Sequence, residues 1–222
     1  MMYCSRGIKV LVLAGCLLGC ISGWSQLTVE GGFQGSEVPG SSGLGPQAMI
    51  SSTEMVAASG FFGGQTLVRL NIQTGISVDY VLGVSDSDSN GLLDGGISSI
   101  GDVYFDGTAI YFTDNFAHGT LFKAVDLDSD GAATKVGEVT AVLPPSSIPN
   151  AANIIRAPDG KLLVTNPVGP GVGSVIAVDE AGGIFNTLVT GLDYAAGIAI
   201  HPQTQDVYVG NSSFPNPGQI YR

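Results

Sequence analysis

A short strand pattern recurs four times along the 222-residue chain, and this repeat constrains the fold more than any other feature. The clearest copies are IYFTDN at 110–115, LLVTN at 162–166 and VYVGN at 207–211, and a weaker copy, MVAASG, stands at 55–60. An apolar strand and a tight turn precede the three clear copies, and a glycine-containing loop and another strand follow. Repeats of roughly 45–55 residues with four short strands each are typical of β-propeller blades.

The composition supports an all-β fold. The chain has 33 glycines, and 44% of its residues are hydrophobic and 12% charged. This composition excludes a disordered chain, and it lacks the Ala/Glu/Lys/Leu bias of a helical protein. No segment keeps a helical apolar period. We therefore expect a β-propeller with about four visible four-stranded blades, the last incomplete, at residues 48–84, 97–143, 150–191 and 194–222. A β-sandwich with accidental internal similarity is the alternative.

The last blade runs out of sequence after its third strand, which leaves two interpretations. A short strand near Leu27–Val29 supplies the missing strand and closes a small ring, or the sequence is a truncated reading frame, which we favour. An unclosed ring exposes a sheet edge. Apart from that strand, the Gly/Ser-rich residues 26–47 are expected to be flexible.

The N-terminus has the pattern of an export signal. Arg6 and Lys9 precede an apolar run too short to span a bilayer, and a cut after Ser25 makes residues 1–25 a signal peptide. The alternative is a lipoprotein with a lipid anchor at Cys20 or Cys16, because both cysteines end a lipobox-like pattern. We expect an exported protein, either extracellular or periplasmic.

The net charge and the positions of the cysteines limit the kinds of partner and of crosslink that we expect. The net charge of −11 disfavours nucleic acid, which needs a basic surface, and suits an exported protein or one that binds cations. All three cysteines lie in the first 20 residues, so the mature domain has no disulfide. No second apolar run is long enough to span a membrane, and the partner is expected to be a polar ligand or a protein of unknown identity.

Two segments resemble a known repeat family. GIAIHPQTQDVYVGN and IIRAPDGKLLVTN resemble the repeats of NHL-type and gluconolactonase-like propellers of the six-bladed type, and the resemblance covers roughly residues 50–222. It implies a propeller fold but no single activity. Gluconolactonases place metal ligands before certain inner strands. The matching positions here are Ala152 and Ala196, so those ligands are absent unless Asn153 substitutes.

Two aspartate-rich loops carry the most specific chemical signal. DSDSNG at 86–91 and DLDSDG at 126–131 match the opening of a Ca²⁺ loop, in which alternate side chains surround the ion and glycine allows a sharp turn. The candidate metal ligands are Asp86, Asp88, Asn90 and Asp94 in the first loop and Asp126, Asp128 and Asp130 in the second. The alternative is a pair of solvated turns. Blade topology predicts that the loops lie on opposite faces, as two separate structural sites.

The propeller face that usually holds active sites carries few titratable groups. Asn115, Asn166 and Asn211 recur there and are candidates to bind a polar ligand, or each caps its own turn. His118, on the same face, is a weak candidate for a general base, as in streptogramin-lyase-like propellers. We therefore weigh a non-catalytic, Ca²⁺-stabilised binding module against a hydrolase or lyase of gluconolactonase or streptogramin-lyase type.

Overall fold

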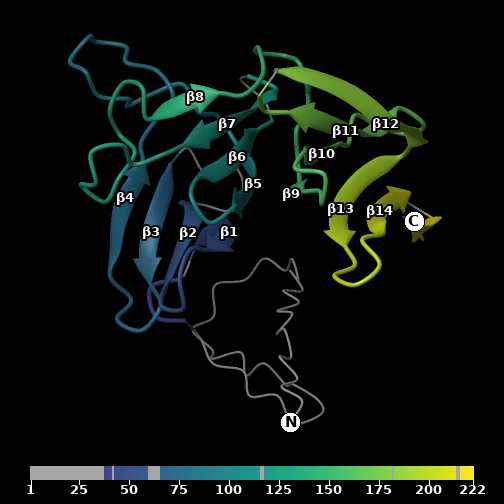
Figure 1. The fold of residues 1–222 in the computed structure, drawn as a ribbon, viewed down its shortest axis with the longest axis horizontal. Coiled ribbons are helices and arrows are strands. Elements are labelled where there is room, and N and C mark those ends of the chain that lie inside the picture. Colours follow the sequence, from purple (N-terminus) through teal and green to yellow (C-terminus); the bar gives the residue numbers. More distant parts are fainter. Residues whose placement is uncertain (1–37, 42, 60–65, 116–117, 182, 214–215) are drawn as a thin grey trace, which may run out of the picture. The chain divides into compact units, whose positions relative to one another are not determined.

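The computed structural model describes residues 38–41, 43–59, 66–115, 118–181, 183–213 and 216–222. The expected signal peptide, its cysteines and the strand at 27–29 lie outside these residues. The described residues form fifteen strands and no helix (Figure 1). They accordingly contain no helix long and apolar enough to cross a membrane.

Consecutive strands assemble into four antiparallel sheets, each with its strands in sequence order. The first sheet contains β1 (Leu44–Met49), β2 (Glu54–Ser59), β3 (Leu67–Asn71) and β4 (Ser77–Val81). The second contains β5 (Ile100–Phe105), β6 (Ile110–Asp114), β7 (Thr120–Ala124) and β8 (Val139–Ala141). The third contains β9 (Ile154–Arg156), β10 (Leu162–Asn166), β11 (Gly173–Asp179) and β12 (Ile184–Leu192). The fourth contains β13 (Tyr194–Ile200), β14 (Val207–Ser213) and β15 (Asn216–Tyr221).

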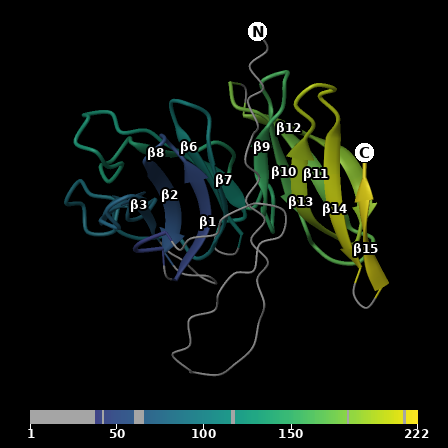
Figure 2. The same cartoon turned by 90° about the horizontal axis from the view of Figure 1, so that it is seen from below.

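This arrangement confirms the predicted fold class, a β-propeller with four blades, of which the last has three strands among the described residues. The first strands of successive blades lie beside one another, with β1 next to β5 and β5 next to β9. The next pair, β9 and β13, can be followed in Figure 2. The first blade begins at Leu44, four residues before the expected start, because β1 pairs with β2 as far as Leu44 opposite Ser59.

The core consists of apolar clusters between neighbouring blades. One cluster joins the first and second blades around Val56, Phe112 and Phe122, and a second joins the second and third around Tyr111 and Leu162. A third cluster, around Leu163 and Val209, joins the third and fourth blades. Central strands such as β6 and β10 are buried along their whole length because a sheet covers each of their faces.

Candidate functional site

The two aspartate-rich loops lie side by side, so the prediction that they occupy opposite faces is wrong. The first joins β4 to β5 and the second joins β7 to β8, as predicted, but Leu92 and Lys135 form an isolated β-bridge between them. The amide of Leu93 donates to Thr134 O at 2.6 Å, and the amide of Val136 donates to Gly91 O at 3.2 Å.

The second loop reaches the first because it folds back over β4 instead of projecting from its own end of the blade. Its Ala133 is fully buried in the cluster between the first two blades, and the amide of Ala133 donates to Tyr80 O at 2.7 Å. The direction of each strand determines the end of the blade at which a loop starts. Burial of Ala133 determines where the second loop packs.

The first loop wraps its backbone around the first acidic side chain. Asp86 accepts the amides of Asn90 and Gly91, at 3.1 and 2.9 Å, and Asp88 accepts the amide of Asn90 at 3.2 Å. Asn90 in turn accepts the amide of Leu92 at 2.8 Å. The chain reverses through two residues with positive φ, Ser89 at 61° and Gly91 at 88°.

The second loop repeats this pattern residue for residue. Asp126 accepts the amides of Asp130 and Gly131, at 3.2 and 2.9 Å, and Asp130 accepts the amide of Ala132 at 3.0 Å. Ser129 and Gly131 take the same positive φ, at 62° and 97°. The carboxylates of Asp126, Asp128 and Asp130 lie within 4.8 Å of one another, an arrangement that could hold a metal ion.

An internal cation distinguishes the second loop from the first. The ammonium of Lys135 contacts both Asp128 and Asp130, and these contacts lower the pKa of Asp130 and raise the pKa of Lys135. The first loop carries a further acid, Asp94, near its end. The carboxylate of Asp94 accepts the hydroxyl of Ser87 at 3.4 Å. A divalent cation would therefore have to displace Lys135 from the second loop.

A buried glutamate, Glu138, holds the base of the second loop. Glu138 is 4% exposed and accepts the amide of Leu127 at 3.1 Å and that of Lys135 at 2.8 Å. Burial raises the pKa of the neighbouring Tyr80, and the nearby charge of Asp126 adds to that rise. The loop is thus held by a buried carboxylate at its base, while Asp128 and Asp130 remain exposed.

A recurring polar position lies near the end of the second strand in three blades, and Asp114, Asn166 and Asn211 occupy it. Asn166 accepts the amide of Asn150 at 3.0 Å, and Asn211 accepts those of Asp193 and Tyr194 at 2.8 and 3.1 Å. These are the contacts expected if each side chain caps a turn. Whether Asn115, Asn166 and Asn211 also bind a polar ligand stays a prediction.

In the second blade the residue equivalent to Asn166 is Asp114, and not Asn115 as the repeat pattern predicts. Asp114 is fully buried and accepts the hydroxyl of Ser98 at 2.8 Å and the amide of Ser99 at 3.3 Å. The alignment of Thr113-Asp114 with Thr165-Asn166 contained this signal. The Oδ1 atom of Asn115 is buried and has no hydrogen-bond partner among the described residues.

The buried Asp114 carboxylate also orients His118. The Nδ1 atom of His118 lies 2.8 Å from Asp114 Oδ2, and its ring meets Phe122 edge to face at 5.5 Å between centroids. The side chain of His118 is 26% exposed. A carboxylate at Nδ1 favours the tautomer that carries the proton there, so Nε2 becomes the basic atom.

Asn153, the candidate substitute for the gluconolactonase-type ligand that is absent at Ala152, contacts a buried carboxylate. Its Nδ2 donates to Asp102 Oδ2 at 3.4 Å, and the same oxygen accepts the amide of Ile154 at 3.0 Å. Burial raises the pKa of Asp102. Because Asp102 lies on β5 and Ile154 on β9, this carboxylate joins the second blade to the third.

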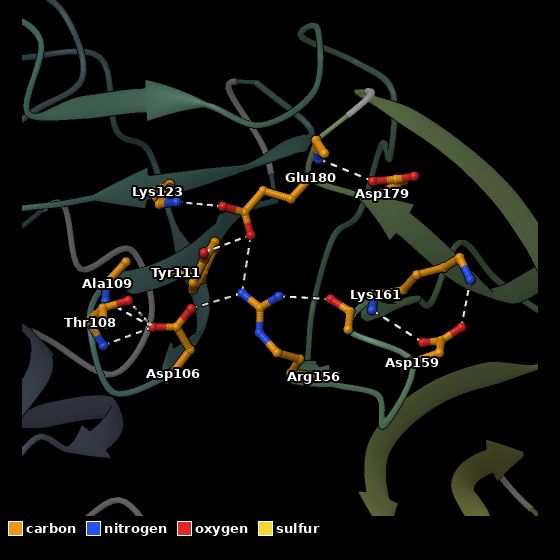
Figure 3. Close-up of polar contacts among 12 residues, drawn as sticks. Asp106, Thr108, Ala109, Tyr111, Lys123, Arg156, Asp159, Lys161, Asp179 and Glu180 are labelled. Carbon is orange, nitrogen blue, oxygen red and sulfur yellow. Dashed lines mark hydrogen bonds and ion pairs between the residues drawn. The ribbon is translucent and has the colours of Figure 1, made fainter.

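A larger charged cluster joins the same two blades, and the sequence pattern gave no hint of it (Figure 3). Glu180 accepts the hydroxyl of Tyr111 at 2.7 Å and contacts Lys123 and Arg156, and Arg156 also pairs with Asp106 at 2.9 Å. Burial opposes ionisation of Asp106 and Glu180, but their donors outweigh it and lower both pKa values, that of Asp106 to about 2. We call these five residues the interblade cluster.

Comparison with solved structures identifies propellers as the relatives in fold. A chain of a nidogen/laminin complex matches with a TM-score of 0.56 and 13% identity, over 76% of this chain and 56% of that one. Virginiamycin B lyase from Staphylococcus aureus matches with a TM-score of 0.50 and 11% identity, over 80% of this chain and 55% of that one.

A third match is the extracellular domain of a putative one-component system from B. thetaiotaomicron, with a TM-score of 0.50 and 13% identity. It covers 79% of this chain and 22% of the other. The protein therefore spans about half, or less, of the propeller chains that it matches. No protein-family model and no curated protein matches the sequence. These likenesses show the β-propeller fold.

Proposed function

We propose that this chain is the propeller of an exported protein and acts as a non-catalytic binding or interaction module whose loops are stabilised by Ca²⁺. Export is supported by the signal-like N-terminus and by the extracellular domain among the structural neighbours. The nidogen/laminin complex is a neighbour in which a propeller-bearing protein engages another protein. A binding role also agrees with the net charge of −11, which suits an exported protein or one that binds cations.

The observation that carries the calcium proposal is the identical backbone wrapping of the two loops. In both, alternate oxygen-bearing side chains curl inward and a glycine at the sixth position reverses the chain, as hard-oxygen coordination requires. The first loop has four such side chains, Asp86, Asp88, Asn90 and Asp94, and no lysine among the residues from 86 to 94. Among the described residues, the second loop brings its three carboxylates within 4.8 Å of one another, so a calcium site is proposed in each loop.

Thermal unfolding with EDTA and with millimolar Ca²⁺ tests this proposal. A ligand that binds only the folded state at about 100 times its Kd stabilises it by about 2.7 kcal/mol, so Ca²⁺ should raise the melting temperature clearly. Asp88→Asn keeps the side-chain volume, removes one charge and should reduce the shift. Asp159→Asn, in an exposed turn of the third blade, is the matched control and should leave it unchanged. An equal melting temperature in EDTA and Ca²⁺ would rule out both sites.

One observation favours a second candidate function, a hydrolase or lyase. His118, oriented by the buried Asp114, has the arrangement of a general base, and a propeller lyase is among the structural neighbours. Proton abstraction by Nε2 would start elimination or hydrolysis. Incubation with virginiamycin B and with a sugar lactone tests this candidate. Turnover that His118→Ala abolishes would support it, and no turnover of either compound would leave the binding role as the better account.

A further inference from the structure

The first acidic loop contains the only asparagine of the sequence that precedes a glycine, Asn90 before Gly91. In such a pair the backbone nitrogen of the glycine can attack the side-chain amide of the asparagine, because a few bonds join the two groups and glycine has no Cβ beside its nitrogen. Both residues are exposed, so water reaches the amide and ammonia can leave. The pair is therefore open to a reaction within the chain.

A carboxylate lies against the attacking nitrogen. The amide of Gly91 donates to Asp86 Oδ2 at 2.9 Å. A general base must lie within hydrogen-bond reach of the proton that it takes, at about 2.6–3.2 Å. The other oxygen of Asp86 accepts the amide of Asn90 at 3.1 Å, which holds the half-buried carboxylate in this orientation. Asp86 Oδ2 is thus placed to take the proton of Gly91 as its nitrogen attacks.

The amide under attack is polarised by its own contacts. Asn90 Oδ1 accepts the backbone amide of Leu92 at 2.8 Å, and Asn90 Nδ2 donates to Asp88 Oδ2 at 3.1 Å. Negative charge develops on Oδ1 when the amide carbon is attacked, and a donor already aimed at that oxygen stabilises the charge. The Leu92 amide is this donor, while the Asp88 carboxylate contacts the nitrogen that leaves.

The second loop shows that a carboxylate fits at this position. Its equivalent residue is Asp130, which accepts the amide of Ala132 at 3.0 Å just as Asn90 accepts that of Leu92. The chain reverses with the same positive φ values in both loops. An aspartate in place of Asn90 therefore keeps the contacts of the first loop and needs no new backbone path.

We propose that Asn90 is a site of spontaneous deamidation, at which the folded first loop converts its own amide to a carboxylate. A bond forms between the Gly91 nitrogen and Asn90 Cγ, and the proton of that nitrogen passes to Asp86 Oδ2. The bond from Cγ to Nδ2 then breaks. The leaving nitrogen takes a proton from water and departs as ammonia, and Asp86 returns its proton to the solvent.

Water next opens the cyclic imide at one of its two carbonyl carbons, which gives aspartate or isoaspartate. The net reaction consumes one water and releases one ammonia, with no oxidation or reduction. Either product leaves the first loop with four carboxylates in place of the three of Asp86, Asp88 and Asp94. The reaction needs no bound metal, so it goes beyond the proposed calcium role and proceeds in EDTA.

Mass spectrometry of digested protein, after incubation in EDTA near neutral pH, follows the conversion, and the Asn90→Asp chain is the standard for the product. Asn186 is the internal control, because it is also exposed but precedes threonine. Asp86→Asn is the test variant, because an asparagine there still accepts an amide hydrogen but cannot take up its proton. Asp128→Asn removes the same charge from the second loop and is the matched control.

We expect Asn90 to be converted much faster than Asn186. Asp86→Asn should slow the conversion about tenfold or more, the loss expected for a general base, and Asp128→Asn should leave it unchanged. In a chain unfolded in urea, hydroxide has to remove the Gly91 proton, so the rate rises with pH. In the folded chain Asp86 takes that proton, and the rate should be nearly independent of pH near neutrality.

Three outcomes would overturn the proposal. The first is an equal rate at Asn90 and Asn186. The second is an Asp86→Asn chain that converts Asn90 as fast as the natural chain does, because Asp86 would then not act as the base. The third is a faster conversion in urea than in the folded chain, because the hydrogen bonds of the loop would then protect the amide. Ca²⁺ binding can fail or succeed without altering any of these results in EDTA.

Discussion

Removal of Glu180 should destabilise the protein much more than removal of an equally charged residue on the surface nearby. The Tyr111 residue is only 1% exposed, and its hydroxyl donates to Glu180 at 2.7 Å. In Glu180→Ala this buried donor loses its partner, which costs about 1–3 kcal/mol. The loss of Lys123 and Arg156 as ion partners adds little, because the Glu180 side chain is 26% exposed and solvent screens the pairs.

For a protein of this size, each kcal/mol shifts the melting temperature by about 2–4 °C, so Glu180→Ala should melt about 2–12 °C lower. Glu180→Gln should fall between the alanine variant and the natural protein, because the amide oxygen still accepts the Tyr111 hydroxyl. Asp159→Ala, which breaks the exposed ion pair with Lys161 on the same blade, should show no measurable shift (Figure 3). Circular dichroism at 218 nm or calorimetry measures all three.

The size of the Glu180→Ala shift decides whether the interblade cluster matters. If Glu180→Ala and Asp159→Ala have the same melting temperature, the buried hydrogen bond from Tyr111 to Glu180 does not stabilise the protein measurably. The cluster would then be a set of ordinary surface ion pairs. A shift in Glu180→Gln as large as that in Glu180→Ala would show instead that the charge, and not the hydrogen bond to Tyr111, is the stabilising part.

Three further predictions concern acid, the second loop and the turn caps. The pKa of Asp106 is lower in the folded protein than its ordinary 3.8, so its contribution to the free energy of unfolding is complete above pH 3.8 and is lost as the pH falls toward about 2. Measuring the free energy of unfolding against pH, for the natural protein and for Asp106→Asn, tests this loss. Lys135→Met removes the internal cation of the second loop and should raise its affinity for Ca²⁺ in titration calorimetry; an unchanged or weaker affinity would contradict the assignment of Lys135 as a competitor. Asn211→Ala leaves the amides of Asp193 and Tyr194 without their acceptor and should cost about 1–3 kcal/mol in urea unfolding, whereas Asn186→Ala, at an exposed position, should be neutral.

The positions of the strands followed from local chemistry. Apolar, β-branched and aromatic residues such as those of IYFTD favour a buried strand, and Asp106-Gly107 and Asp159-Gly160 favour the tight turns between strands. Because each blade folds from consecutive residues, the period of the repeat was enough to predict the blades. The backbone wrapping of the two acidic loops was also local, since the side chains of Asp86 and Asp126 bond to amides four and five residues ahead.

The contacts between distant residues could not be predicted in this way. Lys123 and Glu180 are 57 positions apart, and nothing in the repeat pattern places them together. The meeting of the two acidic loops depends on Ala133, which is buried against the first blade only after the blades have packed. The identity of the turn cap in the second blade, Asp114 in place of Asn115, depends on a register that the strand pairing fixes.

The sequence by itself thus determined the class of fold, the number of blades and the geometry within each loop, because short-range periodicity and turn chemistry specify them. Only the tertiary structure decided that the two acidic loops are neighbours, that Asp114 holds His118, and that Glu180 joins the second blade to the third. These features arise where separate blades or loops meet, and packing between elements far apart in the chain has no local signature in the sequence.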